Sequence, residues 1–399
     1  MFRGLVVNEW LKLIHKRRFV LTTAIFLAFS LYSIGNAYYW NYVKHPPKAP
    51  AVIEQELRSA ITNTNKKLAT VKPGSEEWLS NTEYLTDQKL NLEEQGAIKN
   101  GQWQVVAKKR IAVLEKRISE KEAAEKEVGW EYEELAKNKY YLAHNITPEW
   151  MYPGKVGGVE GVYSVFGSGA LLLALMIVLM VADIVSGEMS DGTVKLLLTR
   201  PPGRWKILTA KYVTAVTSTI ALVMVGALIT LALNGLVFGI HDYNQPEAVG
   251  KKYIAKAVQN ELGITEIRPF ADGSGVKAIP RWQFGLAILG LLLIPLITVA
   301  TLTFAASVIF NTPLVGMGLM TAALMGGVIF EARMGSSTLL LANFVTYLRL
   351  YAYLVTGSPV EGDPISPVNL AGAIAILVAY CLVSLAAAYA VFKRRDILV

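Results

Sequence analysis

The amino-acid sequence predicts an all-α integral membrane protein, with six transmembrane helices and an extracellular helical hairpin or coiled-coil domain. Two observations lead to this fold class. Apolar runs without Asp, Glu, Lys or Arg recur along the 399 residues, and a helix needs about 20 apolar residues to cross a hydrocarbon core about 30 Å thick. The net positive charge is confined to alternate segments between these runs, which is the asymmetry that orients membrane proteins.

Residues 1–18 are predicted to form an amphipathic interfacial helix. At 100° per residue, Glu9 and Lys12 fall on a polar side, whereas Trp10 and Leu13 fall on an apolar side. A basic helix with a Trp-bearing apolar face suits the inner surface of a membrane. A plain cytoplasmic extension of the first span is the alternative interpretation.

Six spans are predicted, and in chain order they cover residues 19–43, 161–183, 209–240, 282–310, 313–331 and 364–392. The first run has 25 uncharged residues, too many for a cleavable signal-peptide core of about 7–15, so we expect it to be retained. The fourth and fifth spans share one long uncharged run. Asn311-Thr312-Pro313 is expected to break that run, because proline ends a helix and asparagine suits a turn.

The charge distribution predicts which segments lie in the cytoplasm. If the amino terminus is inside, the segments that lie in the cytoplasm are residues 1–18, the 184–208 loop, the Asn311 turn and the 393–399 tail. The whole net charge of +8 then falls on these cytoplasmic segments. We therefore expect a multi-pass plasma-membrane protein in contact with the lipid bilayer. The basic balance reflects topology, and no aromatic-plus-basic module for nucleic acid occurs.

Residues 44–160 form a long polar insert with 18 basic and 18 acidic residues. Pro73-Gly74 and Asn100-Gly101 are turn signals that divide the insert into helical pieces. The longest predicted helix, Gln102–Ala143, carries an interrupted heptad seam that favours a helical hairpin or a short coiled coil outside the membrane. A spacer and a surface that meets a substrate or partner are the two open interpretations.

Two further segments are expected outside the cell. Residues 241–281 are polar with little periodicity, which predicts a loop with short helices. Residues 332–363 contain an uncharged stretch, Met334–Leu348, that is too short to span a membrane. A re-entrant or interfacial hairpin is expected there, because such backbone is tolerated where protein buries it.

The cytoplasmic loop 184–208 combines a helix signal with a turn. Thr193–Leu198 supports a short helix with acidic charge near its amino end, and Pro201-Pro202-Gly203 forces a turn. Leu196 and Leu197 would be exposed on that helix and would need something to cover them. A membrane protein that receives force from a soluble motor would need such a part.

The stretch GEMSDGTVKLLLTRPPGRWKILTAKY, Gly187–Tyr212, resembles the cytoplasmic loop of ABC-2 type ABC-transporter permeases. NEWLKLIHKRR, Asn8–Arg18, is similar to the amino-terminal helix of that family, and FKRRDIL, Phe392–Leu398, is similar to its tail. In letters the resemblance covers these three stretches, and in pattern it covers all six spans. Pro202 departs from the pattern, and the 44–160 insert resembles variants from Gram-positive bacteria.

The resemblance implies a permease subunit of an ATP-driven exporter. It implies two such subunits, identical or paralogous, around a central path, and separate ATP-binding subunits that hydrolyse ATP. The residues expected to contact an ATP-binding subunit are Glu9, Lys12, Glu188, Thr193, Lys195, Leu196, Leu197 and Arg204.

The sequence predicts no catalytic site in this chain. No G-x-x-x-x-G-K-[ST] motif occurs, so we expect ATP-Mg to bind a partner subunit and this chain to be no enzyme. The four histidines are scattered and the single cysteine, Cys381, lies in the last span. We therefore expect neither a metal site nor a cofactor.

Three polar residues are candidates for a translocation pathway: Asn234, Glu331 and Arg349. Polar groups inside a membrane often mark pathways. Asn234 could instead bond a neighbouring helix, and Glu331 and Arg349 could form a structural clamp near the outer edge.

An alternative function is a non-transporting sensor or scaffold that binds a ligand or partner through residues 44–160. A passive channel is a weaker reading, because no charged ring or filter loop repeats. The chemical nature of any transported substrate stays open.

Overall fold

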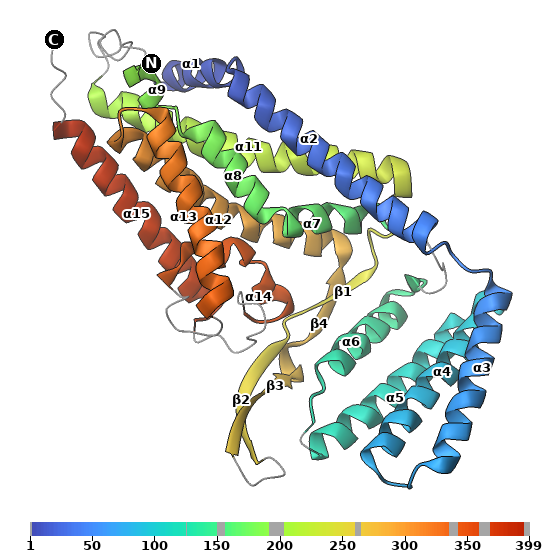
Figure 1. Ribbon diagram of the computed structural model, residues 1–399. Coiled ribbons are helices and arrows are strands. Elements are labelled where there is room, and N and C mark those ends of the chain that lie inside the picture. Colours follow the sequence, from blue (N-terminus) through green and yellow to red (C-terminus); the bar gives the residue numbers. More distant parts are fainter. Residues whose placement is uncertain are drawn as a thin grey trace. The chain divides into compact units, whose positions relative to one another are not determined.

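A computed structural model describes the chain in seven stretches, residues 2–124, 126–149, 156–190, 203–259, 265–334, 342–358 and 368–394. The fold is mainly helical (Figure 1). It divides into two units, each described by itself. The first comprises Met1–Ile34, Gly161–Leu236 and Gly285–Val399, and the second comprises Gly35–Glu160 and Val237–Phe284.

The described chain contains six helical stretches that are long and apolar enough to cross a membrane. Their helices are α2 (Arg17–Tyr38), α8 (Ala170–Val181) continued by α9 (Ser186–Ser190), α11 (Arg204–Phe238), α12 (Arg281–Ile309), α13 (Pro313–Met334) and α15 (Leu370–Arg394). The prediction of an all-α integral membrane protein with six spans is confirmed. The expected break at Asn311 is present, because α12 ends at Ile309 and α13 begins at Pro313.

The predicted second span, 161–183, is not one helix. It is divided at Gly169 into α7 (Gly158–Ser168) and α8, which have different inclinations in Figure 1. A Cβ atom at Gly169 would lie 2.6 Å from the carbonyl oxygen of Val165 and 2.7 Å from the ring of Phe29. Glycine therefore permits the close packing at this kink.

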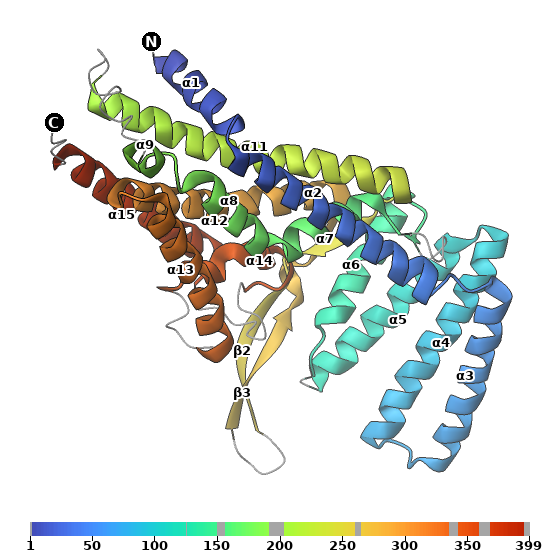
Figure 2. The ribbon, with the colours of Figure 1, turned by 45° about the horizontal axis from the view of Figure 1, so that its top comes forward.

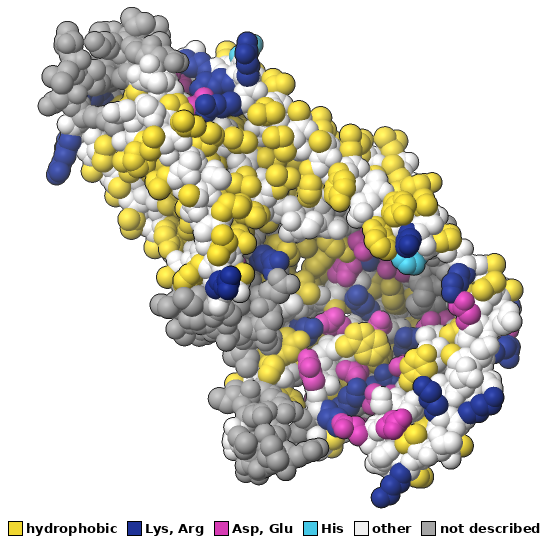
Figure 3. Space-filling view, viewed as in Figure 1, with side chains coloured by type: hydrophobic (Ala, Val, Ile, Leu, Met, Phe, Trp, Pro, Cys, Tyr) yellow, Lys and Arg dark blue, Asp and Glu magenta, His cyan; other side chains and the backbone are white. Residues whose placement is uncertain are grey.

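Helix α8 forms the centre of the first unit. Ala174, Ile177, Val178 and Val181 are fully buried, and a helix that is apolar on all sides is expected in such a position. Its core also includes side chains of α2, α11, α12 and α13. On outer helices, by contrast, large apolar side chains such as Leu382 are exposed, and Figure 3 shows hydrophobic side chains spread over the visible face of this unit. Such a surface suits contact with lipid.

Three shorter elements complete the first unit: α1 (Phe2–Ile14), the 3₁₀-helix η5 (Phe344–Arg349) and α14 (Ala352–Val355). Asn343 begins η5, because its Oδ1 accepts from the N–H of Val345 at 3.2 Å and its Nδ2 donates to the carbonyl of Gly327 at 2.9 Å. Tyr347 and Leu350 are fully buried. Part of the predicted re-entrant segment is thus covered by protein; residues 335–341 and 359–367 lie outside the described residues.

The second unit contains four consecutive helices, α3 (Pro50–Thr70), α4 (Glu76–Asn100), α5 (Trp103–Ala123) and α6 (Gly129–His144), preceded by the π-helix η1 (Tyr39–Lys44). Figures 1 and 2 show these four helices side by side in chain order. Both predicted turns occur. Ser75 caps α4 by accepting from the N–H of Trp78 at 3.2 Å, and Gly101 ends it with φ of 69°, a conformation that favours glycine.

The prediction of one helix over Gln102–Ala143 is wrong, because α5 ends at Ala123 and α6 begins at Gly129. The apolar seam is interrupted just before this break by Lys121, and glycine is a poor helix former. Val128, which lies in the segment that connects the two helices, is buried, with 3% of its surface exposed.

The prediction of a loop with short helices over 241–281 is also wrong. The chain forms two antiparallel strand pairs: β1 (Pro246–Val249) with β4 (Lys277–Pro280), and β2 (Lys252–Gln259) with β3 (Thr265–Asp272), with the short 3₁₀-helix η3 (Gly273–Gly275) between β3 and β4. Gly250, with φ of 84°, makes the turn from β1 to β2. Strands of this length depend on their partners, which a scan for helical periodicity does not detect.

Candidate functional site

A closed ring of ion pairs connects three helices of the first unit. Lys211 of α11 places its Nζ 2.7 Å from Glu9 Oε2 and 2.8 Å from Glu188 Oε2. Lys12 of α1 places its Nζ 3.0 Å from Glu9 Oε1 and 2.8 Å from Glu188 Oε1. Each carboxylate therefore bridges both ammonium groups. We call these four residues the ionic ring.

Local structure explains how the ring forms. Glu9 and Lys12 are three positions apart on α1, so their side chains lie on one helix face. Helix α9 carries Glu188, and the backbone N–H groups of Val185 and Ser186 both donate to the Oγ of Ser307 at 3.1 Å. A hydroxyl of α12 thus holds the start of α9, and Glu188 follows within one turn.

Burial makes the ring's charge balance important. Only 3% of Lys211 is exposed, and its Nζ also donates to the carbonyl of Ile184 at 3.1 Å. A buried ammonium group is costly unless it is paired and hydrogen-bonded. Burial lowers the pKa of Lys12, but its hydrogen bond and charge interaction with Glu188, together with the charge of Glu9, outweigh this effect and raise the pKa above its ordinary value. The ammonium group of Lys12 is therefore charged at neutral pH.

Further polar contacts fasten α1 and the start of α2. Lys16 Nζ lies 2.9 Å from Asp183 Oδ2, in the turn between α8 and α9, and Arg18 Nη1 lies 3.8 Å from the same oxygen. Trp10 Nε1 donates to Thr217 Oγ1 of α11 at 2.9 Å. Trp10, from the side predicted to be apolar, and the basic residues that follow α1 therefore make polar contacts within the chain.

The structure brings together three of the eight residues predicted to contact an ATP-binding subunit, namely Glu9, Lys12 and Glu188. Arg204 is exposed and begins α11. The other four, Thr193, Lys195, Leu196 and Leu197, lie outside the described residues. Sequence reasoning did not include Lys211 as a site residue. A lysine at the edge of an uncharged span was the available signal, because such a charge needs a partner.

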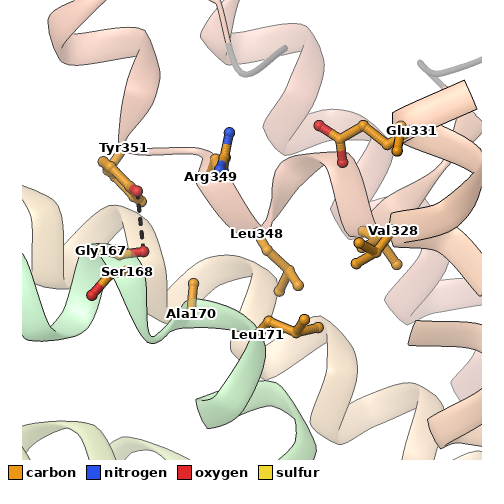
Figure 4. Close-up of a pocket in the computed structure, with 11 residues that line it drawn as sticks. Gly167, Ser168, Ala170, Leu171, Val328, Glu331, Leu348, Arg349 and Tyr351 are labelled. Carbon is orange, nitrogen blue, oxygen red and sulfur yellow. Dashed lines mark hydrogen bonds between the residues drawn. The ribbon is translucent and has the colours of Figure 1, made fainter. Parts of the chain in front are cut away.

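A second candidate region is a cavity of about 580 Å³ in the first unit. It is lined by the α7–α8 junction, α13 and the η5 segment (Figure 4). The hydroxyl of Tyr351 donates to the carbonyl of Gly167 at 3.2 Å. Glu331 and Arg349, two of the predicted pathway residues, project from α13 and η5 and both line this cavity.

Asn234, the third predicted pathway residue, is not among the residues that line the cavity. It is 2% exposed, and its Nδ2 donates to the carbonyl of Thr230 in its own helix at 2.9 Å. A Cβ atom at Gly161 would lie 2.2 Å from Asn234 Oδ1. This asparagine therefore fills a close approach between α11 and α7.

Among the residues that the structure describes, no three His, Cys, Asp or Glu side chains are placed to hold a metal ion. The ionic ring joins helices, and the cavity offers one acidic and one basic side chain in a lining of mixed polarity.

The chain is similar to known proteins over a stretch that includes the ionic ring and the cavity. The family described as "ABC-2 family transporter protein" matches residues 4–397. The chain is also 24% identical over 299 residues to "Uncharacterized protein YhcI" of Bacillus subtilis (strain 168), an alignment that covers 75% of this chain and 85% of that protein.

Proposed function

The chain belongs to the ABC-2 family of transporter proteins, and we propose that it is the permease subunit of an ATP-driven exporter in the plasma membrane. ATP-Mg would bind separate ATP-binding subunits, since this sequence has no phosphate-loop motif. Two permease subunits, identical or related, would surround the path, with their termini in the cytoplasm. The family match along nearly the whole chain supports this proposal.

The position of the ionic ring carries the coupling part of the proposal. Helix α9 ends at Ser190 and α11 begins at Arg204, so the two helices flank the loop expected to contact the ATP-binding subunit. Both helices contribute a carboxylate or an ammonium group to the ring. A displacement of the loop therefore has a short route into α11, which is long and apolar enough to cross a membrane.

Exposure divides the expected contact residues into two roles. Lys12 is 40% exposed, whereas the side chains of Glu9 and Glu188 are 9% and 15% exposed. We therefore assign direct contact to Lys12, Arg204 and the Thr193–Leu198 segment. Glu9 and Glu188 would act through the ring, by making α1 move together with α9 and α11.

The outer part of the path would include the cavity of Glu331 and Arg349. The kink at Gly169 and the hydrogen bond from Tyr351 bring α7 and η5 together at this cavity. Movement of α8 after ATP binding would change its size. Its acidic and basic side chains would favour a solute that carries polar or charged groups.

The test uses the tagged full chain co-expressed with an ATP-binding-cassette subunit. The double substitution Leu196→Ala and Leu197→Ala is expected to reduce copurification of that subunit and its ATPase activity in lipid nanodiscs by at least tenfold. The matched control is Leu382→Ala with Val383→Ala, which truncates an exposed pair on α15. Equal copurification of both double variants would contradict the proposal.

A further inference from the structure

The helices of the second unit enclose a cavity of about 290 Å³ that the proposed function does not use. Residues of α4, α5, α6, the chain after α6 and β1 line it. They are Glu94, Arg110, Glu134, Lys137, Asn138, Tyr141, Glu149 and Pro246. Seven of these eight side chains carry a polar group, which is unusual for space between packed helices.

Three buried polar atoms at this cavity have no hydrogen-bond partner in the described part of the chain; one of them, Glu94 Oε1, is in an ion pair with Arg110. Asn138 is 2% exposed. Its Nδ2 donates to the carbonyl and to Oε2 of Glu134 at 2.8 and 3.1 Å, but its Oδ1 is unpartnered. The Nε of Arg110 is unpartnered as well. Because buried polar atoms are nearly always satisfied, the cavity is prepared for a molecule that both donates and accepts.

The charges around the cavity leave an excess of acceptors. Arg110 Nη2 lies 2.6 Å from Glu94 Oε1, and Glu149 is paired with Arg281. Lys137 lies 3.6 Å from Glu247. Glu134 has no cationic partner among the residues that the structure describes. A ligand with one positive charge would therefore complete the set.

The burial of Glu94 also indicates that the cavity lacks a positive charge. It raises the pKa of this carboxyl to about 7, although the charge of Arg110 on α5 acts in the opposite direction. The negative charges of Glu134 on α6 and Asp87 on α4 raise the pKa further. The other charged residues that line the cavity are Lys137 and Glu149. Close to neutral pH, the positive charge near Glu94 is therefore too small to keep its carboxyl group fully ionised.

We propose that this cavity binds a primary ammonium group with a neighbouring carbonyl oxygen, as found in an amino acid or at the amino terminus of a peptide. The three N–H donors of the ammonium match Asn138 Oδ1 and the carboxylates of Glu134 and Glu94. The carbonyl oxygen accepts from Arg110 Nε. The site belongs to the second unit, so the proposal does not rest on the transport function.

Other ligand classes fit the cavity less well. A divalent cation takes six or more oxygen ligands or nearly ideal octahedral geometry, and here Arg110 and Lys137 line the same space. A quaternary ammonium is recognised by several aromatic faces, whereas Tyr141 is the single aromatic residue in the lining. An anion would face an excess of carboxylates.

The experiment measures binding of glycinamide to the purified full chain in lipid nanodiscs, by calorimetry and by thermal stabilisation. N-acetylglycinamide, which has the carbonyl group but lacks the ammonium, is the matched probe. We expect glycinamide to bind and the acetylated probe to bind at least tenfold more weakly. Equal binding of the two probes would overturn the proposal.

Variants locate the site. Asn138→Leu and Glu134→Gln are each expected to weaken glycinamide binding at least tenfold. Glu134→Gln retains the shape of its half-buried side chain, so it still tests the site if Asn138→Leu does not fold. Glu120→Gln, at an exposed position on α5, is the control and is expected to leave binding unchanged. Unaltered affinity in Glu134→Gln would place the ligand elsewhere and overturn the proposal.

Two additional measurements sharpen the assignment. The affinity for glycinamide is expected to fall about tenfold for each pH unit below 7, because the ligand then competes with a proton on Glu94. An affinity that does not change between pH 5 and pH 8 would argue against the site. Triglycine amide, which has a free amino terminus, distinguishes the two sources. Binding of both probes indicates peptide termini, and binding of glycinamide alone indicates a free small amine.

Discussion

Two groups of buried charge, one in each unit, are built on different plans. The ionic ring of the first unit contains two ammonium groups and two carboxylates, and each carboxylate contacts both ammonium groups. In the second unit a single guanidinium, that of Arg281, faces four carboxylates. These are Asp242 at 3.3 Å, Glu247 at 2.8 Å, Glu160 at 3.9 Å and Glu149.

The difference shows how each group tolerates a lost charge. In the ring, removal of one charge leaves an excess of one, and removal of an opposite pair restores neutrality. At Arg281, removal of the guanidinium leaves four carboxylates, with Lys137 3.6 Å from one of them, Glu247. Burial raises the pKa of Glu160 although the charge of Arg281 opposes this effect. Asp242 has additional support, because it accepts from the backbone N–H groups of Val159 and Glu160 at 3.1 and 2.9 Å.

The largest expected effect is that of Arg281→Met. The residue is 4% exposed, and removal of one partner of a buried ion pair costs about 3–5 kcal/mol. We expect a large drop in the midpoint of thermal unfolding, followed by tryptophan fluorescence in detergent micelles. Arg58→Met, at an exposed ion pair on α3, is the control. Equal midpoints for the two variants would contradict the central role of Arg281.

The second effect is that of Lys211→Met in the ionic ring, which leaves Glu9 and Glu188 buried with Lys12 as their remaining cation. We expect a loss of about 3 kcal/mol in the free energy of unfolding. Adding Glu9→Gln should recover part of this loss, because the ring is again neutral. A double-mutant cycle measures the recovery; additive effects would show that the ring is not one coupled unit.

The third effect is a pH dependence that depends on Glu94. Its pKa is about 7 in the folded protein and 4.5 in the unfolded chain, so the folded state holds a proton that the unfolded state releases. This contribution to stability is present below pH 4.5 and is lost as the pH rises towards 7. We expect the unfolding free energy to fall by about 2 kcal/mol between pH 5 and 7. In Glu94→Gln this slope should be absent; an identical slope would assign it to another group.

The smallest expected effect concerns an uncharged contact in the first unit. Tyr351→Phe removes the hydrogen bond to the carbonyl of Gly167 and should cost about 1 kcal/mol. Faster hydrogen exchange of the η5 backbone would register the loss. Tyr32→Phe, at a side chain that is 70% exposed on α2, is the control. If the two variants exchange alike, the bond contributes little to the cavity wall.

Parts of the candidate site could be predicted because their signals are local. Short sequence patterns singled out Glu9, Lys12 and Glu188 as residues that contact an ATP-binding subunit, and that contact stays a prediction. Their mutual contact could not be found in this way, since Lys12 and Glu188 are 176 positions apart and no pattern within one helix records the partner in another. Lys211 was not predicted as a site residue for the same reason, because its place in the ring follows from burial and not from its neighbours in sequence.

The sequence by itself determined the six apolar helices, the turn between α12 and α13 and the two turns that begin and end α4. These features depend on the hydropathy of contiguous residues and on the backbone preferences of proline, serine and glycine, which act over a few positions. The tertiary structure alone decided the break between α5 and α6, the strand pairs over 246–280, the ionic ring and the Asn138 cavity. Each of these depends on which distant side chain or backbone group becomes a neighbour, and that is set by packing.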